Sequence, residues 1–255
     1  MGPPSASERV RLHVLGEFEL RVGGEQVPLP RTAQRLLVFL AIRDRPVQRS
    51  TVAGTLWPDA GDEEARTCAR AALSRLRRRG VEPVRAVGSQ MSLAPGIVLD
   101  LREAQAVAHR ALRSDERPTT PPRRDEDLRD LDRGSSSRGV APPDRLLEAD
   151  LLPDWDEDWL VVERERFRSL RLHALETVAA RLTDQGSFGE AAEAALMAIA
   201  ADPLRETAHR ALIRVFLAEG NQADAVRHLE SFTSQLREEL GIEPSFDLRG
   251  QSATA

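Results

Sequence analysis

Apolar and polar residues alternate in short runs within residues 9–29, a spacing typical of short β-strands with one buried and one exposed face. Val10, Leu12 and Val14 share one face of the first predicted strand. Gly23-Gly24 has the composition of a two-residue hairpin turn. We therefore expect a small antiparallel sheet with strands over residues 9–15, 17–22 and 25–29.

The apolar spacing then changes to three and four residues, which predicts α-helices. Thr32 and Ser50 are the expected N-caps of the first two helices, and Pro46 and Pro58 follow the helix ends. Two alternating segments on either side of residues 88–90 predict a β-hairpin with a polar tip. The expected elements are helices over residues 32–43, 51–57 and 62–79, and a hairpin over residues 84–94.

The third of these helices has two unlike faces. At about 100° per residue, one arc collects small and apolar side chains: Ala65, Cys68, Ala69, Ala72 and Leu76. The opposite arc collects polar and basic ones: Arg66, Thr67, Arg70, Ser74, Arg77 and Arg78. Acidic residues open the helix and arginines close it, as the helix dipole favours, and Gly80 is the expected stop. Taken alone, the basic arc fits either a helix in a DNA major groove or an ordinary solvated surface.

From residue 146 onward the apolar pattern is helical throughout, and the segment before it is rich in proline and serine with few apolar residues. Such a composition predicts a flexible linker. Gly186 and Gly220 are 34 residues apart, as are Ala191 and Ala225, which is the period of tetratricopeptide repeats. Pro203 is expected at the first position of a helix. The predicted helices cover residues 158–184, 188–201, 204–219 and 222–240.

Charge and composition restrict the function further. All 36 basic residues are arginine, which excludes a Walker A lysine, a Schiff-base lysine and a lysine general base. Residues 1–111 have 17 arginines against 12 acidic residues, whereas residues 146–255 have 11 against 21. A net charge of +5 at the front and −10 at the rear favours an anionic partner for the front part only.

Nothing in the sequence points to catalysis or to a bound metal or cofactor. The single cysteine excludes an internal disulfide and a Cys-pair zinc site, and the five histidines lack metal-ligand spacing. Neither a nucleophile elbow nor a glycine-rich phosphate loop is present. Because no apolar run is long enough to span a bilayer and the N-terminus lacks the apolar core of a signal peptide, we expect a cytoplasmic protein without membrane contact.

The front part resembles the winged-helix domain of OmpR-type regulators, and more closely that of the Streptomyces antibiotic regulatory protein (SARP) family. The matching segments are residues 14–20 (VLGEFEL), 34–37 (QRLL), 56–58 (LWP), 74–77 (SRLR) and 100–103 (DLRE). The rear part resembles the bacterial transcriptional activator domain that follows the winged helix in that family. Its matching segments are residues 163–166 (ERER), 202–206 (DPLRE), 220–221 (GN) and 238–244 (EELGIEP).

The expected fold is mainly α with an α+β N-terminal part: a winged helix-turn-helix domain followed by an all-α, tetratricopeptide-like helical bundle. The predicted boundaries are residues 9–112 for the winged helix, 113–145 for the linker and 146–249 for the activator domain. The resemblance implies a sequence-specific activator that binds double-stranded promoter DNA at direct repeats, as a head-to-tail homodimer, and recruits RNA polymerase holoenzyme.

Helix geometry assigns candidate DNA contacts within this scheme. Arg66, Thr67 and Arg70 lie early in the third helix and are the expected contacts to base edges, with Ala71 against a thymine methyl. Ser74, Arg77 and Arg78 are expected at phosphates. Further backbone candidates are Thr32 and Arg35 in the first helix and Arg85, Ser89 and Gln90 in the hairpin. The alternative is a helical-repeat regulator that binds a protein or a small ligand and whose winged helix does not bind DNA.

Overall fold

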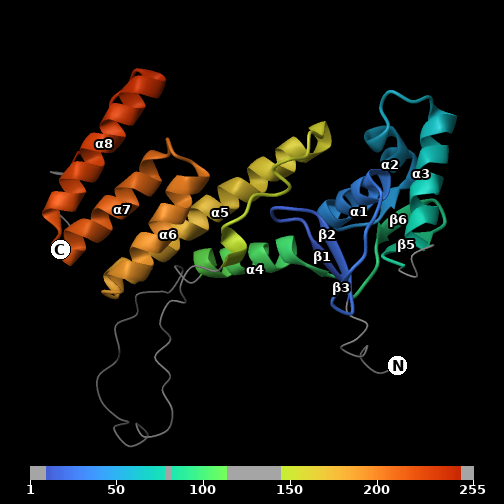
Figure 1. Cartoon of the computed structure of the whole chain (residues 1–255), viewed down its shortest axis with the longest axis horizontal. Helices are drawn as coiled ribbons and strands as arrows, with labels where there is room; N and C mark the ends of the chain where they lie inside the picture. Colours follow the sequence, from blue (N-terminus) through green and yellow to red (C-terminus); the bar gives the residue numbers. More distant parts are fainter. Residues whose placement is uncertain (1–9, 78–81, 114–144, 248–255) are drawn as a thin grey trace, which may run out of the picture. The chain divides into compact units, whose positions relative to one another are not determined.

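The computed structural model describes residues 10–77, 82–113 and 145–247, which form two compact units (Figure 1). The first unit comprises residues 1–104 and 149–167, and the second comprises residues 105–148 and 168–255. The predicted helix stop Gly80 and residues 114–144 of the predicted linker lie outside the described residues.

The front of the chain follows the predicted order of sheet, three helices and hairpin. Its elements are β1 (Val10–His13), β2 (Glu19–Val22), β3 (Glu25–Gln26), α1 (Arg31–Arg43), β4 (Val47–Gln48), α2 (Arg49–Leu56), α3 (Asp62–Arg77), β5 (Val84–Val87), β6 (Gln90–Leu93), β7 (Val98–Leu99) and α4 (Asp100–Arg113). The two-residue strands β4 and β7 were not expected, because segments of that length have no periodicity to detect.

Two small sheets frame the three helices. The first has the order β3-β2-β1-β7, in which β1 and β2 are antiparallel and β7 lies parallel to β1. Leu12 is paired with Leu20 on one side and with Leu99 on the other, and all three side chains are buried. The second sheet, β4-β6-β5, contains the predicted hairpin. Gly23 and Gly24, with φ angles of 60° and 94°, make the predicted turn between β2 and β3.

The expected N-caps of the first two helices are wrong. α1 starts after Pro30, whose carbonyl oxygen accepts hydrogen bonds from the amides of Ala33 and Gln34, so that Thr32 lies inside the helix. α2 starts after Gln48, so that Ser50 is also helical. Gln48 is paired with β6, and the chain therefore passes directly from a strand into the helix without a side-chain cap.

A segment that the sequence assigned to the rear domain belongs to the first unit. The amide of Gly16 donates to the carbonyl oxygen of Asp150 at 2.7 Å, and that of Leu152 donates to Val14 at 3.0 Å. The two chain segments thus pair edge to edge next to the first sheet, with an antiparallel bridge between Leu15 and Leu151.

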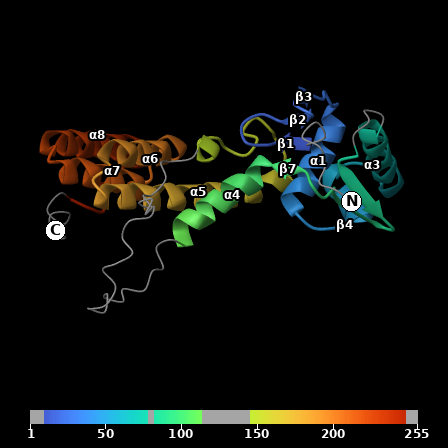
Figure 2. The ribbon, with the colours of Figure 1, turned by 90° about the horizontal axis from the view of Figure 1, so that it is seen from below.

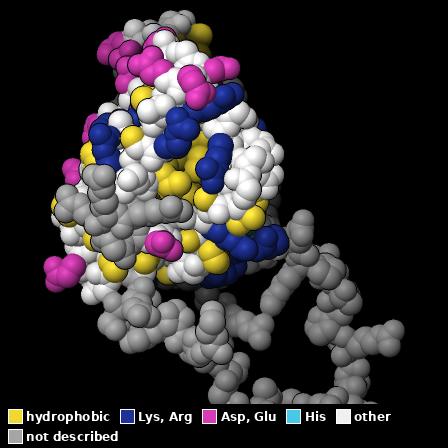
Figure 3. Space-filling view, turned by 90° about the vertical axis from the view of Figure 1, so that its right-hand side faces the viewer, with side chains coloured by type: hydrophobic (Ala, Val, Ile, Leu, Met, Phe, Trp, Pro, Cys, Tyr) yellow, Lys and Arg dark blue, Asp and Glu magenta, His cyan; other side chains and the backbone are white. Residues whose placement is uncertain are grey.

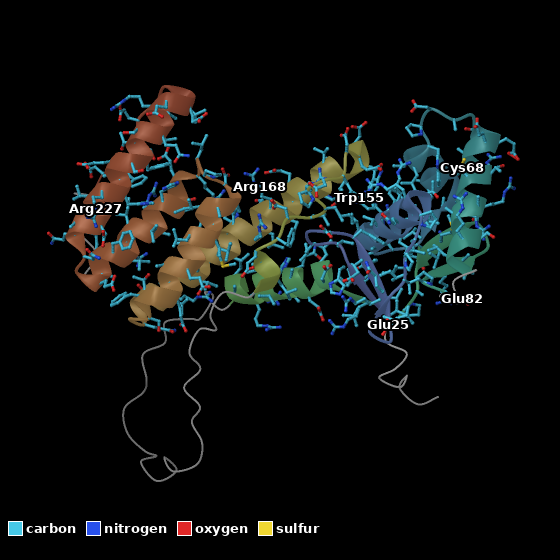
Figure 4. The ribbon with its side chains drawn as sticks, in the orientation of Figure 1. Glu25, Cys68, Glu82, Trp155, Arg168 and Arg227 are labelled. Atoms are coloured by element: carbon cyan, nitrogen blue, oxygen red, sulfur yellow. The ribbon has the colours of Figure 1, made fainter. Side chains whose placement is uncertain are left out.

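Trp155 anchors the same segment (Figure 4). Its side chain is buried, with its ring centroid 6.0 Å from that of Phe18 and the Arg31 guanidinium 3.6 Å above it. Two residues later, Glu157 forms an ion pair with Arg35 of α1, with 2.7 Å between Nε and Oε1. Residues 149–167 are therefore packed against the sheet and against α1.

Asp100 joins the start of α4 to the first sheet. Its carboxylate accepts hydrogen bonds from the backbone amides of Val14, Leu15 and Leu101 at 2.7–3.1 Å. Burial raises the pKa of Asp100 above its usual value, and these hydrogen bonds oppose the rise. In the sequence, Asp100 stood out only as part of the family-like segment 100–103, whereas the structure shows a carboxylate that satisfies amides 85 and 86 residues away.

The second unit is a stack of helical hairpins that confirms the predicted all-α rear. Its helices are residues 105–113 of α4, residues 168–184 of α5 (Asp158–Asp184), α6 (Phe188–Ala201), α7 (Glu206–Glu219) and α8 (Gln222–Leu240), and it also contains the 3-10 turn Arg145–Leu147. Figures 1 and 2 both show α6, α7 and α8 side by side. Gly186 and Gly220 adopt φ angles of 77° and 88° at the two equivalent turns, and Ala191 and Ala225 are fully buried one turn later.

One predicted helix start in this unit is wrong. Pro203 lies in a turn, and α7 begins at Glu206 after Arg205. The amide of Arg205 donates to the Asp202 carbonyl oxygen at 3.1 Å, and this turn delays the helix. Among the described residues, no helix is long and apolar enough to cross a membrane.

Two histidines meet between α7 and α8. His209 is buried. Its Nδ1 lies 3.0 Å from Nε2 of His228, and its own Nε2 lies 2.9 Å from the Pro203 carbonyl oxygen. Because the carbonyl oxygen only accepts, Nε2 of His209 bears the proton and Nδ1 accepts from His228. Burial lowers the pKa of both rings, and the positive charge of His209 lowers that of His228 further.

We expect the second unit to lose stability as the pH falls below the ordinary histidine pKa of 6.5. The folded state favours neutral rings, so this contribution is present above that pH and is lost below it. The free energy of unfolding, measured by urea denaturation between pH 7 and pH 5, should decrease. His228→Gln retains an amide donor toward His209 but removes one titrating group, and should reduce the decrease. An equal decrease in the free energy of unfolding in the unaltered protein and in His228→Gln would contradict the assignment of this pH dependence to the histidine pair.

Candidate nucleic-acid interface

α2 and α3 form a compact helix-turn-helix. Ala53 of α2 packs with Ala65 and Ala69 of α3 in one buried cluster, with Trp57 and Ala60 of the turn against it. Small side chains at the contact let two helix backbones approach closely. The amide of Ala65 donates to the Gly61 carbonyl oxygen at 2.9 Å at the start of α3. The hairpin β5–β6 follows α3 along the chain, in the position of a wing (Figure 1).

α3 has the two faces that its sequence predicts. Ala65, Ala69, Ala72 and Leu76 are buried. Cys68, which the helical periodicity assigns to the apolar arc, is only half-buried (Figure 4). It therefore lies at the margin of the apolar face and not within the core. The exposed side of the helix is therefore available to a partner along its described length.

Arg66, Thr67 and Arg70 are exposed and linked to one another through short contacts. Arg66 forms an ion pair with Glu63 at 3.1 Å, and Arg70 donates to the Thr67 hydroxyl at 2.9 Å. That hydroxyl in turn donates to the Glu63 carbonyl oxygen at 2.9 Å. The structure thus holds the three predicted base-contact residues together at the first half of α3.

A hollow of about 150 Å³ opens beside these arginines. Its lining comes from the start of α2, from both faces of α3 and from strand β6: Arg49, Ser50, Arg66, Ala69, Arg70, Leu73 and Met91. Figure 3 views the side of the molecule that contains α3 and the hairpin, and shows basic side chains around a hydrophobic patch. The base of the hollow is apolar and its rim is cationic.

The remaining predicted residues of α3 and the hairpin differ in environment. Ala71 is half-buried, whereas Ser74 is exposed. Arg77 is the last described residue of α3, and Arg78 lies outside the described residues. Arg85, Ser89 and Gln90 are exposed on the hairpin, and the Ser89 carbonyl oxygen accepts from the amide of Arg49 at 2.8 Å. That hydrogen bond ties the tip of the hairpin to the first residue of α2.

The two candidates in α1 already have partners within the first unit. Arg35 forms a two-point contact with Glu157, because its NH2 group also donates to Oε2 at 2.8 Å. Thr32 accepts a hydrogen bond at 2.8 Å from Arg75 of α3. Both side chains hold the unit together, and we therefore leave them out of the proposed DNA contacts.

Five residues of the hollow were not identified as interface residues from the sequence: Arg49, Ser50, Ala69, Leu73 and Met91. The sequence predicted Ser50 only as a helix cap and Met91 only as part of the hairpin, and it gave Arg49 no role. Leu73 had a detectable signal, since the helical wheel places it about 20° from Arg66 and about 40° from Ala69, at the boundary between the basic and apolar arcs. It widens the apolar face of α3 towards the basic residues.

Negative charge also lies close to the interface. Asp62, Glu63 and Glu64 occupy the exposed first turn of α3, where carboxylates suit the positive end of the helix dipole. These groups disfavour close approach of phosphates at that end, so a nucleic acid would meet the cationic residues further along the helix. The described residues contain no cluster of His, Cys, Asp and Glu side chains that could hold a metal ion.

Comparison with known proteins relates these features to described families. The family described as "Bacterial transcriptional activator domain" matches residues 99–253, which is more than half of the chain. The regulatory protein AfsR of Streptomyces coelicolor is 29% identical over 244 residues, which cover 93% of this chain. The same alignment covers only 23% of AfsR, so the chain spans about a quarter of the length of that relative.

A solved structure shares the fold. EmbR of Mycobacterium tuberculosis, determined in complex with a low-affinity phosphopeptide, superposes with a TM-score of 0.67 at 20% sequence identity. The match covers 96% of this chain and 64% of that one. The predicted class, a winged helix-turn-helix followed by a helical region, is confirmed.

Proposed function

The chain belongs to the bacterial transcriptional activator domain family and is a SARP-type transcriptional regulator, and we propose that it binds double-stranded promoter DNA through α3. The observation that supports this proposal most strongly is the outer face of α3, where exposed Arg66, Thr67 and Arg70 lie beside a cation-rimmed hollow. A helix of this kind, second in a helix-turn-helix and followed by a hairpin, has the geometry of a major-groove recognition helix.

We assign the contacts by position along the helix. Arg66, Thr67 and Arg70 contact base edges, because the N-terminal half of a recognition helix enters the groove most deeply. Arg49, Ser74, Arg77 and Arg78 contact phosphates, and Arg85, Ser89 and Gln90 do so from the hairpin. Arg49 is added because it shares the rim of the hollow with Arg66 and Arg70.

The family relationship extends the proposal to the rear domain. Residues 146–255 have a net charge of −10, which disfavours direct DNA contact. We propose that this domain recruits RNA polymerase holoenzyme to promoters with direct repeats. A head-to-tail homodimer on DNA follows from such repeats, because each copy then meets an identical half-site. The site of action is the cytoplasm, at the nucleoid.

A salt series tests the DNA-binding proposal. An operator is first selected from random double-stranded DNA with the purified protein, and its affinity is measured at several salt concentrations. About four cationic phosphate contacts (Arg49, Arg77, Arg78 and Arg85) predict a slope near −3.6 in log affinity against log salt, or roughly a 100-fold loss between 50 and 200 mM. If the selection enriches no sequence and the affinity for duplex DNA does not depend on salt, the result favours the protein-binding or ligand-sensing alternative.

A further inference from the structure

The hollow beside the basic residues of α3 has an apolar base. Leu73 is half-buried at the boundary between the apolar and basic faces of α3, in the same hollow as Arg66 and Arg70. Ala69 and Met91 are almost fully buried beneath it, at 6% and 3% exposure. The opening thus combines three apolar side chains with three guanidinium groups, the third being that of Arg49.

This combination matches one chemical feature of the DNA major groove. Among the four bases, only thymine presents an apolar group there, its C5-methyl, whereas guanine presents two acceptors that suit arginine. A methyl group is close to a water molecule in size and fits within the hollow. A phosphate fits the rim but not the base of the hollow, because Ala69, Leu73 and Met91 offer no side-chain hydrogen-bond donor.

We propose that the hollow formed by Ala69, Leu73 and Met91 takes up the C5-methyl group of a thymine in each operator half-site. Arg66 and Arg70, at its rim, contact the neighbouring bases, so that this thymine lies next to a guanine. The inference rests on the proposed DNA binding. It moves the methyl contact away from Ala71, which does not line the hollow.

The methyl group can be removed without any other change to the base. Each thymine of the selected operator is replaced in turn by deoxyuridine, and the affinity is measured by fluorescence anisotropy. One position in each half-site should lose about fourfold in affinity, the value of one buried methyl group, and the other positions should change little. If the operator binds but no position responds, the inference is overturned while the proposed function stands. If no operator binds, the proposed function itself fails.

Leu73→Ala then connects the methyl group to the hollow. Shortening this side chain removes the contact, so the variant should bind the thymine and deoxyuridine operators with nearly equal affinity. Val162→Ala removes an exposed apolar side chain on α5 of the same unit and should retain the fourfold difference. If a folded Leu73→Ala protein keeps the fourfold difference in affinity between the two operators, the methyl group is contacted elsewhere. If the variant does not fold, the deoxyuridine series on the unaltered protein decides.

Discussion

The double variant Arg66→Ala, Arg70→Ala is expected to lose roughly 30-fold or more of its affinity for the selected operator. Both guanidinium groups lie on the exposed face of α3 and at the rim of the hollow. A bidentate contact between arginine and guanine contributes about 1–3 kcal/mol, so the loss of two such contacts amounts to about 2–6 kcal/mol. The measurement is anisotropy titration of the operator and of an unrelated duplex, since loss of base contacts reduces the preference between them.

A charge-matched control separates base contact from general electrostatics. Arg11 and Arg21 are exposed and lie opposite each other on β1 and β2. Arg11→Ala, Arg21→Ala removes the same net charge and should reduce operator affinity by no more than a few-fold. Arg70→Lys adds a finer comparison, because it retains the charge but loses the planar fork that binds guanine at two points. Equal losses in the two double variants would contradict base contact by α3.

Trp155→Ala is expected to destabilise the first unit by about 3–5 kcal/mol. The ring is 6% exposed and packs against Phe18 and beneath the Arg31 guanidinium, so truncation leaves a cavity between residues 149–167 and the sheet. Urea denaturation gives the free energy of unfolding. Hydrogen exchange locates the effect, because amides of β1, β2 and α1 should lose protection while those of α6–α8 retain it.

The control for this prediction lies in the same segment. Val161 is 56% exposed on α5, so Val161→Ala should change the free energy of unfolding by less than about 0.5 kcal/mol. A loss of less than about 1 kcal/mol in Trp155→Ala would contradict the assignment of residues 149–167 to the first unit. A large loss would mean that the DNA-binding fold depends on chain that follows residues 114–144, and that a fragment ending before this segment is incomplete.

Element type and order could be predicted well because they depend on local patterns. The helices α5, α6 and α8 have the predicted bounds. Helix starts were less predictable, since Thr32 and Ser50 have cap-forming side chains but the chain enters those helices from Pro30 and from the paired strand β4. Helix starts depend on where the preceding backbone is held, and that is a tertiary property.

The candidate interface could be predicted only in part, because it combines the local pattern of one helix with residues from other elements. A helical wheel separates Arg66 and Arg70 from Ala65, Ala69 and Ala72, and the structure places them accordingly. It says nothing about Arg49 or Met91, which reach the hollow from α2 and β6. Nor does it show that Arg35, itself a predicted DNA contact, is held by Glu157 122 residues away.

By itself, the sequence determined the periodicity of each element, the amphipathic character of α3, the excess of arginine at the front and the repeat of Gly186 and Gly220. These properties depend on the spacing of residues along the chain or on composition. The tertiary structure alone decided that residues 149–167 complete the first unit, that Asp100 satisfies the amides of Val14 and Leu15, and that Leu73 shares a hollow with Met91. Each of these joins side chains or backbone groups far apart in the chain, and hydrophobic periodicity shows which face of an element is buried but not which partner buries it.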